Sequence, residues 1–291
     1  MCRPATTSAF QGAAGDGAAR PPGWLGELRL EYARRRERTV LAHRQHAGPL
    51  LVQRSFHPEG APCHNYVIHP PGGVVGGDRL ELAARIGTGA HAVITTPAAA
   101  KFYRSAGALA EQRQCFDVAP GGALEFLPAE TILHGASRVA LHNRFELGEG
   151  ARLCTWDVLC LGRPGSGDHY RGGHCLQDLQ LLRGGMLQLH DRLLLRDGDA
   201  MLRAPWGLAG FPVIGTLVAT PVDPGLERLL REGLASRGDV RLGLTRIGDV
   251  LVLRCLGVGA EPVRAALEQA WAMLREPVFG RHPSPPRIWK T

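Results

Sequence analysis

RIGTGAHAVITTP (Arg85–Pro97) decides how we expect this chain to fold, because its plan recurs twice. DVAPGGALEFLP (Asp117–Pro128) and ELGEGARLCTW (Glu146–Trp156) also end one strand, turn at glycines and begin a second strand of alternating apolar residues. The anchoring glycines of the three segments lie about thirty residues apart: Gly89, Gly121 and Gly150. This period fits a stacked β structure in which each layer covers the apolar face of the next.

The sequence therefore predicts a mainly β protein with stacked, β-helix-like layered sheets and about two α-helices in the C-terminal half. Alternating or continuous apolar runs predict the strands outside the repeats: Trp24–Tyr32, Thr39–Leu41, Leu50–Gln53, Asn65–Ile68, Leu80–Ile86, Ser137–Leu147, Leu153–Leu161, Leu176–Leu182, Met186–Leu195, Phe211–Ala219, Val240–Arg246 and Asp249–Leu256. His43–His46 is predicted to be a polar connection between strands. Helices are predicted near 224–237 and near 261–275, each with a proline near its start.

The length suits one large β domain or two smaller domains, and we predict a single β-rich domain over residues 23–291 after a disordered tail over residues 1–22. The 38 glycines and 21 prolines among 291 residues suit many short strands joined by turns. The net charge of +7 comes mostly from arginines spread along the chain, which suits acidic protein partners as well as nucleic acid. The aromatics are few and do not interleave with the basic residues, so stacking on single strands is not expected, and we predict no nucleic-acid partner. Seven cysteines without a CxxC motif argue against a disulfide framework or a zinc knuckle. We expect a cytoplasmic protein with no membrane segment.

A glycine-rich turn lies within PCHNYVIHPPGGVVGGDRLEL (Pro62–Leu82). It is no phosphate-binding loop, because Asp78 and Arg79 stand where lysine and a hydroxyl residue are required. Its glycines shape a turn or an interface instead: Gly72, Gly73, Gly76 and Gly77.

Polar side chains flank this turn and leave two interpretations open. Cys63 and His64 are neighbours in a predicted strand and point to opposite faces, so they cannot easily hold one ion together. A structural role is expected for Cys63, since a free cysteine commonly behaves as a small buried hydrophobe. The sharper alternative is a metal-dependent hydrolase that uses His64, His69 and Asp78.

Two further polar groups occur near the repeats. Lys101, Tyr103 and Arg104 form either a solvated strand end or a contact for a protein partner, since tyrosine and arginine are frequent interface anchors. Carboxylates within apolar runs are not expected to be buried unpaired, so they pair with arginine or line a wet channel: Glu125, Glu130 and Asp157. The terminal Ile288 and Trp289 are expected to dock on the domain or on a partner.

Seven stretches in order give the chain a family resemblance: Gly48–Phe56 (GPLLVQRSF), Cys63–Asp78 (CHNYVIHPPGGVVGGD), Thr95–Ser105 (TTPAAAKFYRS), Leu124–Ile132 (LEFLPAETI), Trp156–Gly167 (WDVLCLGRPGSG), Trp206–Gly215 (WGLAGFPVIG) and the terminal PRIWKT. Together they resemble the urease accessory protein UreD family, called UreH in some organisms. They extend over nearly the whole chain from Trp24 onward.

The resemblance implies a chaperone without catalytic residues or a tightly bound cofactor. Family members bind the helical protein UreF, as a dimer of heterodimers, and recruit the GTPase UreG. The assembly docks on apo-urease and promotes GTP-dependent nickel insertion. An internal water-filled tunnel is implied as the path of the transient nickel ion, with Thr96, Glu130 and Asp157 as candidates for its lining. His64 and His69 are candidates for transient nickel contacts.

The chain departs from the family pattern at the same motifs. Ala129 and His134-Gly135 replace a glutamine and an acidic-glycine turn, and Asp157 stands where relatives tend to have glutamate. A shorter carboxylate keeps the charge but reaches less far into a tunnel. Besides the hydrolase, a basic nucleic-acid-binding module is a third hypothesis, which the lack of a basic recognition helix weakens.

Overall fold

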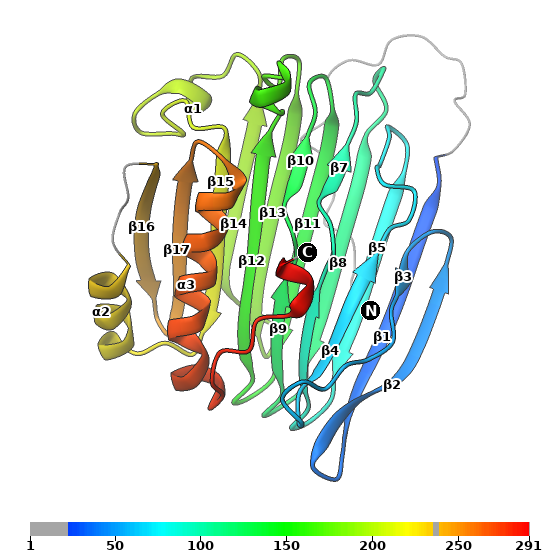
Figure 1. Cartoon of the computed structure of the whole chain (residues 1–291), viewed down its shortest axis with the longest axis vertical. Helices are drawn as coiled ribbons and strands as arrows, with labels where there is room; N and C mark the ends of the chain where they lie inside the picture. Colours follow the sequence, from blue (N-terminus) through cyan, green and yellow to red (C-terminus); the bar gives the residue numbers. More distant parts are fainter. Residues whose placement is uncertain (1–22, 235–238, 291) are drawn as a thin grey trace.

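Two stacked β-sheets and a long C-terminal helix make up the computed structural model, which describes residues 23–234 and 239–290 (Figure 1). In this part of the chain, the seven-stranded sheet has the order β14-β13-β11-β8-β5-β1-β2. The ten-stranded sheet has the order β16-β17-β15-β12-β9-β6-β4-β3, with β7 and β10 paired beside it. The predicted mainly β, β-helix-like fold is confirmed. The expected tail over residues 1–22 lies outside the described residues.

The seven-stranded sheet contains β1 (Leu25–Arg35), β2 (Arg38–Ala47), β5 (Arg79–Ile86), β8 (Ala110–Val118), β11 (Arg138–Leu147), β13 (His174–Arg183) and β14 (Met186–Arg196). The ten-stranded sheet contains β3 (Leu51–Val52), β4 (Cys63–Ile68), β6 (His91–Thr95), β7 (Ala100–Phe102), β9 (Ala123–Leu127), β10 (Thr131–Leu133), β12 (Arg152–Leu161), β15 (Val213–Thr220), β16 (Val240–Ile247) and β17 (Val250–Gly257). The α-helices are α1 (Ala200–Arg203), α2 (Pro224–Gly233) and α3 (Ala260–Phe279), with short 3-10 turns at Pro164–Ser166 and Arg287–Lys290.

The sequence repeat is a repeat of structure. Each copy leaves the seven-stranded sheet, turns at its anchoring glycine and enters the ten-stranded sheet, giving the pairs β5–β6, β8–β9 and β11–β12. Gly89, Gly121 and Gly150 have φ of +63°, +65° and +63°. A left-handed conformation at these turns suits glycine, because other residues lose about 1–2 kcal/mol there. Strands of successive copies pair in parallel, so the copies stack as layers.

Parallel pairing places residues at equal positions of the repeat side by side. Ile86 pairs with Val118, which pairs with Leu147, and all three are buried between the sheets. The ring of Phe116 lies 5.0 Å from that of Phe145 in the next layer. Each such apolar side chain contributes about 1.5–3 kcal/mol on burial, so the ladder of layers forms a continuous core.

The outermost strands run antiparallel to their neighbours. Strand β2 pairs with β1, and it contains residues 43–46, so the polar connection predicted for His43–His46 is wrong. These side chains are exposed at the edge of the sheet, and their polarity reflects solvent contact while the backbone still pairs. At the other end, β14 pairs antiparallel with β13, and β15, β17 and β16 form an antiparallel extension of the ten-stranded sheet.

Helix α3 packs on the outer face of the ten-stranded sheet, over β12, β15 and β17 (Figure 1). The predicted apolar face is confirmed, since Val263, Leu267, Trp271 and Leu274 are buried. The helix runs farther than predicted, through Pro277 to Phe279, because burial of Val278 and Phe279 offsets the one backbone hydrogen bond that the proline cannot donate. Helix α2 begins as predicted at Pro224 and ends at Gly233, whereas residues 235–237 of the prediction lie outside the described residues. No described helix is both long enough and apolar enough to cross a membrane.

The turn glycines give a direct test of the fold. Gly121→Ala should lower the free energy of unfolding by about 1–2 kcal/mol, because alanine is strained at this φ although its methyl group meets no atom within 4 Å. Gly243→Ala in β16 is the matched control: it also meets no atom within 4 Å, and its φ is not positive. Urea unfolding of both variants measures the difference. Equal stabilities would contradict a requirement for a left-handed residue in the repeated turn.

Candidate functional site

A cavity of about 410 Å³ lies between the two sheets. Its lining comes from both of them: Gln112 and Gln114 belong to β8 in one sheet, and Asp157 belongs to β12 in the other. Thr96 follows β6 and also lines the cavity. Much of the remaining wall is apolar, so the few polar groups decide which solute is attracted.

Asp157 is the carboxylate of this cavity. Its neighbour Trp156 packs in the apolar cluster under α3, so the alternation of β12 turns Asp157 toward the opposite sheet. There Asn143 Nδ2 and Gln177 Nε2 donate to Asp157 Oδ2 at 2.9 and 3.2 Å. Burial raises the pKa of Asp157 to about 7, although these two hydrogen bonds lower it and the charge of Asp191 raises it further. The carboxyl group therefore exchanges its proton near neutral pH.

The polar side chains continue as a row beyond Asp157. Thr216 is its partner in the register of β12 and β15, and Arg254 Nη1 donates to Thr216 Oγ1 at 2.8 Å. Arg254 also pairs with Asp191 of β14 at 2.5 Å, and its side chain is 39% exposed. The row thus runs from the cavity to a partly solvated ion pair.

The polar row divides the space between the sheets into two apolar clusters. On β11, Leu141 belongs to one cluster and Phe145 to the other, with Asn143 between them. On β12, Leu159 and Leu153 are divided in the same way by Asp157. Polar residues thus interrupt the apolar core at a matching level on both sheets.

Two of the three tunnel candidates, Thr96 and Asp157, lie on the wall of this cavity. Thr96 Oγ1 accepts from the backbone N–H of Ala129 at 2.8 Å. The third, Glu130, is not among the residues that line it, and its carboxylate lies 3.7 Å from Arg264 of α3.

Four of the turn and contact candidates also line the cavity: His69, Gly72, Gly73 and Lys101. Burial lowers the pKa of His69 below its ordinary value, and the charge of Asp78 offsets part of this effect. His69 is therefore neutral at pH 7 and keeps a nitrogen lone pair for a metal ion.

The glycine turn is built by close approach. A methyl group on Gly73 would lie 2.1 Å from the ring of Tyr103, and one on Gly76 would lie 2.3 Å from Ser105 Oγ. Gly77 has a φ of +101°. Asp78 completes the turn, because its carboxylate accepts from the backbone N–H of Trp24 at 2.8 Å and of Val75 at 3.0 Å. The glycines were predicted to shape either a turn or an interface. They shape the turn, and Gly73 and Gly76 also let it pack closely against Tyr103 and Ser105 of the segment that follows β7.

The segment after β7 presents two of the predicted contact residues. Tyr103 is 41% exposed and stacks on His134 at 5.0 Å between ring centroids. Arg104 is exposed. A partner contact at Tyr103 and Arg104 stays a prediction.

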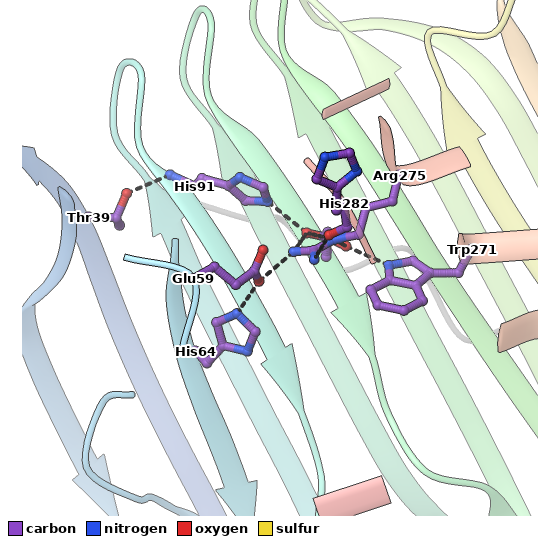
Figure 2. A network of polar contacts seen from close by, with 8 residues as sticks. Thr39, Glu59, His64, His91, Trp271, Arg275 and His282 are labelled. Carbon is purple, nitrogen blue, oxygen red and sulfur yellow. Dashed lines mark hydrogen bonds and ion pairs between the residues drawn. The ribbon is translucent and has the colours of Figure 1, made fainter. Parts of the chain in front are cut away.

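On the outer face of the ten-stranded sheet, a buried ion-pair network joins β4, β6 and β9 to α3 (Figure 2). Arg275 is fully buried, and its Nη2 lies 2.6 Å from Glu59 and 3.1 Å from Glu125. Trp271 Nε1 donates to Glu125 at 2.5 Å. His64 contacts Glu59, and His91 contacts Glu125, each at 2.7 Å. The network attaches the helix to the stacked sheets.

Glu125 shows how strongly this network is coupled. Burial alone would raise the pKa of Glu125, but the hydrogen bonds and charges of His91 and Arg275 outweigh it and lower the pKa to about 2. The expectation that a carboxylate inside an apolar run is paired is confirmed for Glu125. Its guanidinium partner is 150 residues away along the chain.

Cys63 and His64 point to opposite faces of β4, as predicted. Cys63 is fully buried in the core between the sheets, where burial raises the pKa of its thiol. His64 lies in the network on the outer face and is 1% exposed.

The hydrolase hypothesis finds no support in this geometry. His64 is bonded to Glu59, Asp78 caps a backbone turn, and His69 lies at the cavity. Over residues 23–234 and 239–290, no group of three or more His, Cys, Asp or Glu side chains is arranged to hold a metal ion. The structure therefore does not bring the three proposed ligands together.

Several residues of both sites were missed by the sequence analysis. Gln112 and Gln114 occupy inward positions of β8 in phase with the buried Ala110 and Phe116, which is a detectable signal. Arg275 lies four residues after Trp271 on the buried face of the predicted helix, and a charge at such a position indicates a buried partner.

Arg275→Met should lower the free energy of unfolding by about 3–5 kcal/mol, because it leaves Glu125 charged and buried without its guanidinium. Arg264→Met on the same helix should cost about 1 kcal/mol or less, since its carboxylate partners are partly exposed. Denaturant unfolding compares the two. Adding Glu125→Gln to Arg275→Met should recover part of the lost free energy of unfolding. If the loss in the double variant equals the sum of the losses in the two single variants, Glu125 and Arg275 do not interact.

Asp157→Asn should stabilise the protein increasingly as the pH rises. The folded-state pKa of about 7 lies above the ordinary value of 3.8, so the wild type loses stability between these pH values and then no further. The difference in free energy of unfolding should grow by at most about 1.4 kcal/mol per pH unit over this range and level off above pH 7. Unfolding at pH 5, 6, 7 and 8 measures it, and a difference independent of pH would contradict a buried carboxylate.

Known proteins resemble this chain over nearly its full length. A family model described as UreD urease accessory protein matches residues 25–290. Urease accessory protein UreD of Alkalilimnicola ehrlichii is 57% identical over 271 residues, which cover 93% of this chain and 92% of that protein. The proteins of the same name from Pseudomonas entomophila and Pseudomonas fluorescens (strain Pf0-1) are 42% and 44% identical, each over 93% of this chain and over 95% and 96% of the relative. The chain therefore belongs to the UreD family of urease accessory proteins.

Proposed function

We propose that this protein is a non-catalytic scaffold of urease maturation through which nickel passes on its way to apo-urease. Family membership supports the role in urease maturation. The observation that carries the nickel path is the cavity of about 410 Å³ between the sheets, with Asp157 on its wall and a polar row beyond it.

The chemistry of the cavity suits an ion in transit. Asp157 offers one carboxylate, Thr96 and two glutamines offer oxygens, and His69 offers a neutral imidazole. Such ligands bind divalent first-row metals, but one carboxylate among neutral groups binds them weakly enough for release. A pKa of about 7 lets Asp157 release a proton when the cation arrives and take it back when the cation leaves. We assign the transient histidine contact to His69, because His64 is held by Glu59 on the outer face.

The proposed partners follow the family. A UreF-type helical protein and a UreG-type GTPase join this chain on apo-urease, with a dimer of heterodimers as the core of the assembly. Exposed Tyr103 and Arg104 beside the glycine turn, and a net charge of +7, favour a contact with an acidic protein surface. Among the described residues, five buried free cysteines suit the reducing cytoplasm: Cys63, Cys154, Cys160, Cys175 and Cys255.

Asp157→Asn should reduce the nickel content of urease matured in its presence by about tenfold, because the cavity loses its negative charge while Asn143 and Gln177 keep a hydrogen-bond partner. The experiment co-expresses urease and its accessory proteins with each variant and measures nickel per active site by mass spectrometry.

Glu130→Gln is the matched control for Asp157→Asn. It removes the same charge outside the cavity wall, beside Arg264, and should leave the nickel content close to that of the wild type. Full nickel loading with Asp157→Asn, or an equal loss with both variants, would refute a path through this cavity.

A further inference from the structure

A second pocket, of about 230 Å³, lies at one end of the stacked sheets. Its lining comes from the β1–β2 turn, from the turn at Gly89, from the first residue of β12 and from the segment that follows α3. It shares no lining residue with the cavity between the sheets. The nickel path proposed above does not use it.

The charges around this pocket are unbalanced. Its lining includes four arginines and one acidic residue, Glu37. The arginines are Arg34, Arg38, Arg152 and Arg281. None of them forms an ion pair with a carboxylate in the described part of the chain, whereas Arg254, Arg264 and Arg275 each do. Four guanidinium groups around a small polar space repel one another, and an anion between them relieves this repulsion.

Arg152 adds an observation of a different kind. Its Nε atom is buried and donates no hydrogen bond to any described residue. A buried charged donor without a partner is costly, and such a group calls for an acceptor that the chain itself does not supply. The backbone of Arg152 is fixed, because its N–H donates to Gly122 O at 2.9 Å at the start of β12.

The walls of the pocket are fixed by other contacts. His91 stacks on Phe279 at 5.4 Å between ring centroids, and its Nε2 is bonded to Glu125. Thr39 Oγ1 accepts from the backbone N–H of His91 at 2.7 Å, a contact visible in Figure 2. Gly280 N donates to Glu276 O at 2.8 Å and so satisfies one carbonyl at the end of α3. The arginines thus surround a space whose backbone is already in place.

We propose that this pocket binds the phosphate group of a small molecule. Guanidinium groups match the geometry of phosphate oxygens and bind them through paired, charge-assisted hydrogen bonds. A water molecule occupies about 30 Å³ of liquid, so 230 Å³ holds a phosphate or diphosphate with a few waters and leaves a larger group outside. The excess positive charge of the lining suits a dianion.

Calorimetric titration of the full chain with sodium orthophosphate tests the proposal, with the ionic strength kept constant by sodium chloride. One phosphate should bind per chain, and Arg152→Gln and Arg281→Gln should each weaken binding by about tenfold, the usual effect of losing one charged hydrogen bond. Arg192→Gln, which removes an exposed arginine of β14 outside the pocket, should leave the affinity unchanged.

Two further titrants identify the source of the phosphate group. Equal affinity for orthophosphate and a nucleoside diphosphate supports a site for the phosphate group alone, and tenfold tighter binding of the nucleotide supports a nucleotide phosphate. Unfolding midpoints without phosphate must match the wild type, and exposed Arg38→Gln replaces any variant that fails this check. Absence of saturable binding at millimolar phosphate, or equal weakening by Arg192→Gln, would overturn the proposal.

Discussion

Parallel stacking in register is the constraint on which the rest of this structure depends. It places equivalent positions of successive repeats side by side on neighbouring strands. Similar residues at one position of the repeat therefore form a row of side chains across the sheet. Ile86, Val118 and Leu147 form such a row with apolar side chains. Gln114 and Asn143 are paired in the same way with polar ones. A polar channel in this fold therefore needs only a change of residue type at matching levels, with the backbone unchanged.

The polar row carries an energetic cost that the apolar clusters on either side offset. Asn143 and Gln177 both donate to Asp157, so the carboxylate is solvated by amide groups of the opposite sheet. These bonds do not restore the pKa of Asp157 to its ordinary range, because burial is the larger effect. A proton on this carboxylate relieves that cost, and a metal ion beside it would do the same, which would link the stability of the fold to the occupancy of the cavity.

More of the fold than of the candidate site could be predicted from the sequence. Glycine turns and alternating apolar residues are local signals, and they located the repeated pairs of strands and the buried face of α3. Arg275 and Glu125 meet across 150 residues, so no local pattern gives their distance. The strand residues His43–His46 have the polarity of a loop, because both faces of this edge strand are in solvent, so the sequence pattern predicts a connection there. The cavity forms where residues of two different sheets face each other. The spacing of residues along a single strand shows which side chains share a face, but it does not show which strand of the other sheet they face.

The two ends of the polar row differ in charge, and this difference bears on how an ion would move through it. On the proposed nickel path, Asp157 would attract a divalent cation to the cavity, where His69 and Thr96, which also belong to the side of the ten-stranded sheet, would add ligands. Arg254 lies beyond Thr216 and is neutralised by Asp191 only while the pair at 2.5 Å is closed. A cation that advances past Asp157 meets the guanidinium at close range and is repelled unless Arg254 turns toward the solvent that already reaches it. Movement of one partly exposed side chain would therefore decide whether the row is a closed cavity or a continuous path, and the backbone of the stacked layers need not move.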